Sequence, residues 1–449
     1  MQASQAGPGA GPAPALSVWR KLGFGTGAAG IGIGNAPISL LLLFYLTEIA
    51  GLPPGLAGVV VGLPKIWDIV IDPLLGGAVD RLSRRRGRRA PLAFVSALAY
   101  VVALYGLFAI PDGLSQGAVM ALAIALLIVS SVAHTAFMVL KLALSDDMSP
   151  EPRARTALLA YSGVLSMLLT LVATALVPFL VKWGGDGREG YARMALVIAA
   201  AGAATFFVFL LSTHRYPALQ PYRSGGEPAL WRSIRMTLGN RPFFWLIGFL
   251  ICLGVSSGLL SAFVPYINQY VLRGGTASLS VLGSIVLIST LIAMPFVTLL
   301  ARRIGNTATL RLSNWIFLAS FPLLWLASYG PLWASWAAVG VFGLGAGGMA
   351  VLLQSTVIDL AKAVLPGGVV VSLGIYLGIL MAAQKLGQSA GSAGAGFVLE
   401  LIGFVPGQAA QSDVTLSVLR LGYTLLPFLL SLLGTVCIRR VRVTAEPAA

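Results

Sequence analysis

Long apolar runs separated by short polar segments dominate this sequence. A helix that crosses a bilayer needs about 20 predominantly apolar residues, and twelve runs are long enough. The pattern predicts membrane-spanning helices at residues 22–50, 56–79, 91–111, 117–144, 157–182, 191–213, 243–270, 278–301, 309–329, 332–357, 369–403 and 414–438. The predicted fold class is therefore an all-α membrane protein with twelve transmembrane helices.

A polar segment divides the twelve predicted helices into two groups of six. Residues 214–242 contain Pro217, Pro221 and adjacent glycines, a composition typical of a linker. The predicted domains are a disordered tail (1–15), an N-terminal six-helix bundle (16–213), a cytoplasmic linker (214–242), a C-terminal six-helix bundle (243–440) and a cytoplasmic tail (441–449). Two parallel six-helix halves with a substrate site between them are typical of the major facilitator fold, which we predict here.

Composition and charge agree with an integral membrane protein. Of the 449 residues, 57% are hydrophobic and 10% are charged, which excludes an ordinary soluble domain. The net charge of +15 does not indicate nucleic-acid binding, because the basic residues form short clusters after every second predicted helix. By the positive-inside rule, both termini are cytoplasmic. We expect a monomeric, multi-pass protein of the bacterial inner membrane, whose partners are the lipid bilayer and a small organic solute.

The sequence gives little sign of catalysis or of a bound cofactor. Cys252 and Cys437 both lie in apolar runs, without a disulfide framework or the spacing of metal ligands. The glycine-rich run 343–348 lacks the Lys-Ser/Thr pair that a phosphate-binding loop requires. We therefore predict a protein that is not an enzyme and whose ligands are its solute and a coupling ion.

Two carboxylates in the second predicted helix are the main candidates for chemistry. Asp68 and Asp72 are four residues apart and share one helix face, with Lys65 one turn earlier. An ionised carboxylate in hydrocarbon costs at least about 2.5–3.5 kcal/mol, so such residues usually mark an ion or proton path. A structural ion pair between Lys65 and Asp68 is the alternative, but it leaves Asp72 unexplained.

Several short motifs of this chain are similar to those of one transporter family. They are Lys21-Leu-Gly-Phe-Gly, Tyr45-Leu-Thr-Glu48, Lys65-Ile-Trp-Asp-Ile-Val-Ile-Asp-Pro73, Gly87-Arg-Arg-Ala-Pro91, Asn240-Arg-Pro-Phe243 and Gln384-Lys-Leu-Gly387. With these motifs, the chain resembles the glycoside–pentoside–hexuronide:cation symporters of the major facilitator superfamily over most of its length. The resemblance implies cation-coupled transport of a small, sugar-like solute by alternating access.

The resemblance also implies roles for individual residues. Asp68 and Asp72 would bind the coupling cation, and Thr135 would contribute an oxygen. Their charge partners would be Lys65 and Lys385. Na+ needs several oxygen ligands in one cage, as oxygen-ligated cations generally do, whereas two close carboxylates can instead hold a proton. Both Na+, for which Asp68 and Asp72 would be the metal ligands, and H+ stay open as the coupling ion.

The chain departs from the sugar-transporting members of that family at two positions. Those members carry carboxylates in the first and fourth helices. The matching positions of this chain lie near Gly32 and Met138, which are not acidic. The remaining candidates for a substrate cavity are Asn35, His134, Ser257, Tyr266, Gln354 and Gln388. Because such a cavity is poor in polar groups, an amphipathic, lipid-like solute is one alternative. A proton-coupled exporter and a non-transporting assembly or sensor protein on the same fold are the others.

Charged residues after the second predicted helix form a candidate cytoplasmic gate. This gate, composed of Asp80, Arg81, Arg88 and Arg89, would hold helix ends together when the cytoplasmic side is closed. A simple topology signal is the alternative, and both roles are compatible. Lys141, near the end of the fourth predicted helix, is expected to extend to the cytoplasmic surface, as long basic side chains do near membrane boundaries.

Overall fold

The protein is an almost entirely helical bundle in the computed structural model, which describes residues 17–64, 88–149, 152–216, 241–362, 373–408 and 410–440. The first half contains α1 (Val18–Phe44), which continues as the π-helical turn η1 (Tyr45–Ile49), a helix at Pro54–Pro64, α3 (Ala90–Phe108), α4 (Gln116–Met148), α5 (Pro152–Trp183) and α6 (Gly187–Thr213). The second half contains α8 (Arg241–Tyr266), which continues as η2 (Ile267–Val271), α9 (Thr276–Ile304), α10 (Asn306–Ala327), α11 (Leu332–Lys362), α12 (Leu373–Leu401) and α13 (Asp413–Arg439).

These helices correspond to the twelve spans that the apolar runs predict. Ten of the helices in the described part of the chain are long and apolar enough to cross a membrane. The predicted span 56–79 is described only over its first part, as the shorter apolar helix Pro54–Pro64. Large apolar side chains are exposed on the outside of the bundle, among them Phe296 at 68% and Val95 at 63%. Such an apolar exterior is expected where the surrounding solvent is lipid rather than water.

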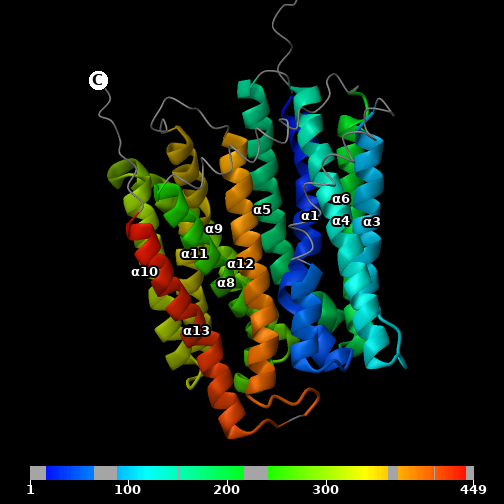
Figure 1. The fold of residues 1–449 in the computed structure, drawn as a ribbon, viewed down its shortest axis with the longest axis vertical. Coiled ribbons are helices and arrows are strands. Elements are labelled where there is room, and N and C mark those ends of the chain that lie inside the picture. Colours follow the sequence, from blue (N-terminus) through cyan, green and yellow to red (C-terminus); the bar gives the residue numbers. More distant parts are fainter. Residues whose placement is uncertain are drawn as a thin grey trace, which may run out of the picture.

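Each half packs mainly on itself. In the first half, α1 packs on α5 and α6, and α3 packs on α4 and α6. In the second half, α8 packs on α12 and α13, and α11 packs on α9 and α10. The two halves meet where α5 packs on α9 and α1 packs on α8 (Figure 1). A site that needs residues from both halves would therefore lie along these helices.

The bundle has two ends that differ in what they carry. α1 begins and α13 ends at the upper end of Figure 1, and α1 passes into η1 at the opposite, lower end. The first helix of each half, α1 and α8, ends in a five-residue π-helical turn. Single π-helical turns inside helices are rare and occur frequently at functional sites. Both turns lie at the lower end, where the halves touch.

Glycine allows α8 and α12 to approach until their backbones touch. A Cβ atom placed on Gly258 would lie 2.1 Å from the carbonyl oxygen of Gln388, and one on Gly391 would lie 2.2 Å from the carbonyl oxygen of Val255. Any side chain at these positions would push the helices apart, because backbone atoms cannot move aside. Small residues at helix contacts are the usual means of close packing in membranes.

Candidate functional site

A buried hydrogen bond joins the π-helical turn η1 to the end of α8 at the lower end. The hydroxyl groups of Thr47 on η1 and Tyr266 at the end of α8 are 2.6 Å apart, and the two side chains are 1% and 0% exposed. The rings of Phe44 and Phe404 contact the Tyr266 ring edge-on, with centroid distances of 5.0 and 5.3 Å. This part of the bundle is thus closed by aromatic packing around one polar contact between the halves.

A carboxylate one residue further along η1 makes a second connection between the halves. Oε2 of Glu48 accepts a hydrogen bond from the Tyr270 hydroxyl at 2.8 Å and another from the Gly407 backbone N–H at 2.9 Å. Tyr270 lies on η2, and Gly407 lies between α12 and α13 with a φ of +74°. Oε1 of Glu48 is buried and has no hydrogen-bond partner among the residues that the structure describes. One acidic side chain therefore connects three segments of the chain.

Further contacts of the halves lie at the same end. Thr276 at the start of α9 donates to Oδ1 of Asp186 at 2.9 Å. A Cβ atom on Gly58 would lie 2.7 Å from the carbonyl oxygen of Ala393, so the helix Pro54–Pro64 touches the backbone of α12. Together with the bonds of Thr47 and Glu48, these contacts form the lower seal, as we call it below.

Arg188 on α6 connects segments of the first half of the bundle at the lower seal. Arg188 donates from Nη2 to the carbonyl oxygen of Ile49 at 2.9 Å and from Nη1 to that of Ile110 at 2.5 Å, and its Nε pairs with Asp112 at 2.6 Å. Three guanidinium nitrogens thus tie the end of η1 to the segment after α3. The carbonyl groups at a helix end lack partners within the helix, and Arg188 supplies one to Ile49.

A buried ion pair lies at the upper end of the first half. Nη1 of Arg89 lies 2.5 Å from Oδ1 of Asp147, and both side chains are 2% exposed. Arg89 belongs to the predicted cytoplasmic gate, but this pair connects α3 to α4 within one half. Arg88 is exposed, and Asp80 and Arg81 lie outside the described residues. Asp147 was not predicted as a site residue, because the apolar run predicts that the fourth helix ends at residue 144, whereas α4 continues to Met148.

The longer α4 also corrects the expectation for Lys141, which does not extend to the surface. Its side chain is 7% exposed, and Nζ donates one hydrogen bond to Oγ of Ser162 at 2.7 Å. Nζ also lies 4.6 Å from the centre of the Phe24 ring, a favourable cation–π position. Since α4 continues for two further turns, the side chain starts too deep to reach water.

The predicted coupling residues of the second span lie outside the described part of the chain. These residues are Lys65, Asp68 and Asp72, and their coupling roles stay predictions. Their predicted helpers are described: Thr135 is half-buried on α4, and Lys385 is exposed on α12. Among the described residues, no group of three His, Cys, Asp or Glu side chains could hold a metal ion.

Two of the predicted cavity residues lie on either side of an unpredicted tyrosine in the first half. The buried hydroxyl of Tyr100 on α3 donates to Oδ1 of Asn35 on α1 at 3.0 Å. The ring of Tyr100 also packs edge-on against the His134 ring of α4, at 6.0 Å between centroids. Tyr100 lies in the third predicted span, 91–111, in which no cavity residue was predicted.

The remaining cavity candidates show other surroundings. Ser257 donates to the carbonyl oxygen of Gly254 on its own helix at 3.0 Å, while Gln388 is half-buried on the neighbouring α12. Tyr266 belongs to the lower seal, and the side chain of Gln354 lies outside the described residues. Asn35 and His134 therefore both contact Tyr100, but the six candidates do not form one group in the described structure.

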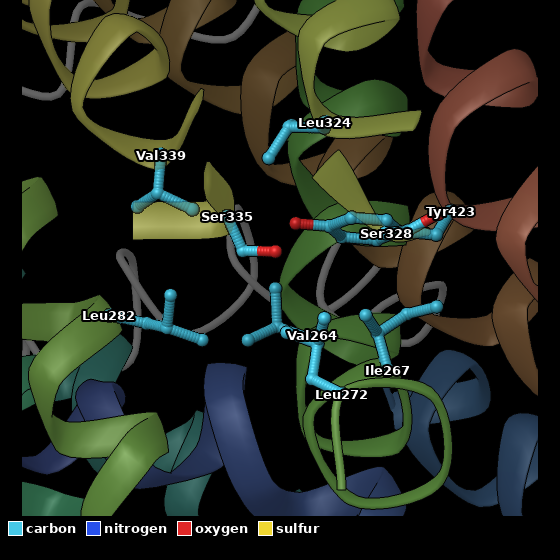
Figure 2. Close-up of a pocket in the computed structure, with 9 residues that line it drawn as sticks. All are labelled: Val264, Ile267, Leu272, Leu282, Leu324, Ser328, Ser335, Val339 and Tyr423. Atoms are coloured by element: carbon cyan, nitrogen blue, oxygen red, sulfur yellow. The ribbon is translucent and has the colours of Figure 1, made fainter. Parts of the chain in front are cut away.

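One small cavity lies inside the second half and is not a solute site. It has a volume of about 20 Å³ and is lined by apolar side chains together with Ser328, Ser335 and Tyr423. Figure 2 shows the hydroxyl groups of Ser335 and Tyr423 pointing into the same space. A cavity of this size holds about one water molecule, so it suits a structural water.

The chain is similar to known transporters over nearly its whole length. A family model described as MFS/sugar transport protein matches residues 23–445. The glucuronide carrier protein homolog of Escherichia coli is 24% identical over 427 residues, which cover 94% of this chain and 92% of that protein. The putative glycoside/cation symporter YagG of Escherichia coli is 26% identical over 263 residues, 57% of this chain and 55% of that protein.

The fold is similar to that of solved transporter structures. The crystal structure of the nucleoside transporter NupG superposes with a TM-score of 0.66 and 12% identity, covering 94% of this chain and 99% of that structure. A likeness at this identity speaks for the fold alone. The predicted fold class, an all-α major facilitator fold with two six-helix halves, is confirmed.

Proposed function

The chain belongs to the MFS/sugar transport protein family, and from this premise we propose that it is a cation-coupled symporter of a small, sugar-like solute. The similarity to a glucuronide carrier homolog and to a putative glycoside/cation symporter supports both the solute class and the coupling. Transport proceeds by alternating access, in which the two halves rock around a site between them.

The lower seal is the observation that carries the proposal. A transporter that alternates must close one end with contacts that it can later break. A buried bond from Thr47 to Tyr266 and a partly buried bond from Tyr270 to Glu48 join the first helices of the two halves and suit that purpose. The clusters of basic residues support an orientation in which both termini are cytoplasmic. On that orientation, the lower seal faces outward, and this conformation is closed toward the outside.

The coupling ion binds at the carboxylates of the second span. Asp68 and Asp72 bind Na+ or H+, with Thr135 supplying an oxygen, and Lys65 and Lys385 are their charge partners. The exposed position of Lys385 on α12 leaves its ammonium group accessible to such a partner. Binding of the ion changes the balance between the two conformations only by as much as its affinity for them differs.

The solute binds between the halves, with polar contacts from both. In the first half, Asn35 and His134 contact the solute, and the buried Tyr100 supports both through its hydrogen bond to Asn35 and its ring contact with His134. In the second half, Ser257 and Gln388 lie on the two helices that pack most closely. The asparagine and the histidine supply hydrogen-bond donors and acceptors, which a hydroxylated solute requires. The transporter works as a monomer in the lipid bilayer.

Thermal unfolding of the purified protein tests the proposal. A ligand that binds the native state raises the melting temperature by mass action. We expect stabilisation by Na+ or by protons together with a glycoside or uronic acid, and loss of the cation effect in Asp72→Asn. The matched control is Asp413→Asn, an exposed carboxylate at the start of α13. A response to lysolipids alone would assign the lipid-like solute instead. A response unchanged in Asp72→Asn would reject the coupling role.

A further inference from the structure

A groove opens at the upper end of the first half, between the start of α1 and the end of α6. Its volume is about 430 Å³, and it is lined by Trp19, Arg20, Leu211, Ser212, Arg215 and Tyr216. α1 and α6 pack against each other, so the groove lies on the seam of two neighbouring helices. A volume of this size is within the usual range for a small-molecule site, about 300–1,000 Å³.

The polar side of the groove is positive. Arg20 donates from Nη1 to the Tyr216 hydroxyl at 3.3 Å, and neither Arg20 nor Arg215 pairs with a carboxylate among the described residues. The helix α1 begins at Val18, and the side chain of Ser17 makes no capping hydrogen bond to it. The first N–H groups of a helix lack partners within it and carry the positive end of its dipole. Two guanidinium groups and one helix start thus contribute positive charge at one place.

The other side of the groove is apolar and faces outward. Trp19 is 82% exposed and Leu211 is 54% exposed. The apolar spans to which they belong begin at Val18 and end at Thr213, so the groove lies where hydrocarbon meets water. Tryptophan is enriched at this level of membrane proteins. A ligand for the whole groove therefore combines an anionic group with an apolar tail.

We propose that this groove binds the phosphate headgroup of an anionic membrane lipid, with its acyl chains along Trp19 and Leu211. Guanidinium groups match phosphate oxygens with two parallel hydrogen bonds, which a lysine ammonium does not reproduce. Basic pockets between transmembrane helices on the cytoplasmic side are known to suit such headgroups. The bound lipid would hold the start of α1 against the end of α6.

The competing explanation is that Arg20 and Arg215 only determine topology. A topology signal requires positive charge, so lysine serves as well as arginine. A phosphate site requires the planar fork, so lysine weakens it. The double variant Arg20→Lys with Arg215→Lys therefore separates the two explanations, because it keeps the charge that membrane insertion needs.

The experiment measures the melting temperature of the detergent-purified full chain with mixed micelles containing phosphatidylglycerol or phosphatidylcholine, and lipid retention by native mass spectrometry. We expect phosphatidylglycerol alone to stabilise the wild type, and the double lysine variant to need about tenfold more lipid for the same effect. The matched control is Arg302→Lys with Arg303→Lys, which changes two exposed arginines in the last turn of α9. We expect this control to keep the wild-type response.

Three outcomes would overturn the proposal. They are an equal response of the wild type and the Arg20→Lys, Arg215→Lys variant, an equal effect of phosphatidylcholine, and full stabilisation by inorganic phosphate without lipid. If the double variant does not fold, the single variant Arg215→Lys provides the same comparison, because the Arg215 side chain makes no hydrogen bond or ion pair with another described residue. Retention of phosphatidylglycerol by Arg215→Lys at the wild-type level would then reject the site.

Discussion

Removal of one hydroxyl group at the lower seal should shift the balance between the two conformations. Tyr270→Phe deletes the donor to Glu48 Oε2, at 2.8 Å in the structure, and keeps the ring that packs edge-on against Phe404 at 5.2 Å. The change therefore removes a hydrogen bond between the halves without removing the apolar contact. Glu48 keeps its second donor, the Gly407 N–H.

The expected size of the effect follows from the kind of bond that is lost. A hydrogen bond to a charged group contributes about 1.5–3 kcal/mol net of hydration. In the proposed rocking motion, this bond breaks when the lower end opens, because Glu48 and Tyr270 belong to different halves. Its whole contribution therefore favours the closed state. A loss of about 1.5–3 kcal/mol changes the ratio of closed to open molecules by about 10- to 150-fold.

Double electron–electron resonance measures the distances between two spin labels, and the populations of those distances give the ratio of closed to open molecules. Leu114 and Val414 are exposed at the lower end, one in each half, and cysteines there can be labelled once Cys252 and Cys437 are replaced. We expect the longer distance to gain population in Tyr270→Phe. Tyr191→Phe is the control, since the ring contacts of this buried tyrosine with other described residues are to Tyr45 and Phe108, both in the first half.

The comparison of Tyr270→Phe with Tyr191→Phe decides whether the bond to Glu48 favours the closed state. If Tyr270→Phe shifts the distance distribution no further than Tyr191→Phe does, the bond to Glu48 does not favour the closed state. An equal shift in both variants would instead show that loss of any tyrosine hydroxyl at this end opens it, whether or not that hydroxyl joins the two halves.

Three further changes test the packing of the bundle by thermal unfolding. Asp147→Asn removes the carboxylate charge that pairs with the buried Arg89 guanidinium and should cost about 3–5 kcal/mol; a melting temperature like that of wild type would contradict this contribution of the pair. Lys141→Met replaces an ammonium that uses one of its three donors and should leave stability unchanged or raise it, so clear destabilisation would refute this account. Gly258→Ala places a Cβ atom against the backbone of α12 and should cost about 1–3 kcal/mol, whereas a neutral effect would show that the helices can separate.

The sequence was sufficient for the helices but not for the contacts between them. Apolar runs determine where a chain can cross a bilayer, and the described helices agree with those runs. Helix ends were less well predicted, because polar residues can continue a helix beyond the membrane. At α4, the four residues beyond the predicted end include Asp147. The buried pair with Arg89 and the burial of Lys141 both follow from that extension.

The lower seal illustrates a second limit of the sequence. Glu48 and Tyr270 are 222 positions apart, so no helical or strand spacing relates them. Glu48 occurs in the motif Tyr45-Leu-Thr-Glu48, but the motif does not reveal its partner. Only the parallel arrangement of the two halves, in which α1 and α8 are the corresponding first helices, brings η1 and η2 together. By contrast, the importance of Asp68 and Asp72 follows from the cost of burying charge, and their roles stay predictions.

A physical connection between the coupling ion and the lower seal is available in the described part of the chain. The helix Pro54–Pro64 leads directly into the segment with Lys65, Asp68 and Asp72, and its Gly58 touches the backbone of α12. α12 also carries Lys385, the other predicted charge partner. An ion that pulls the second span toward or away from α12 would therefore change a contact of the seal itself. Since a ligand acts on a conformational balance only through contacts that differ between the states, this shared boundary with α12 is where coupling would be transmitted.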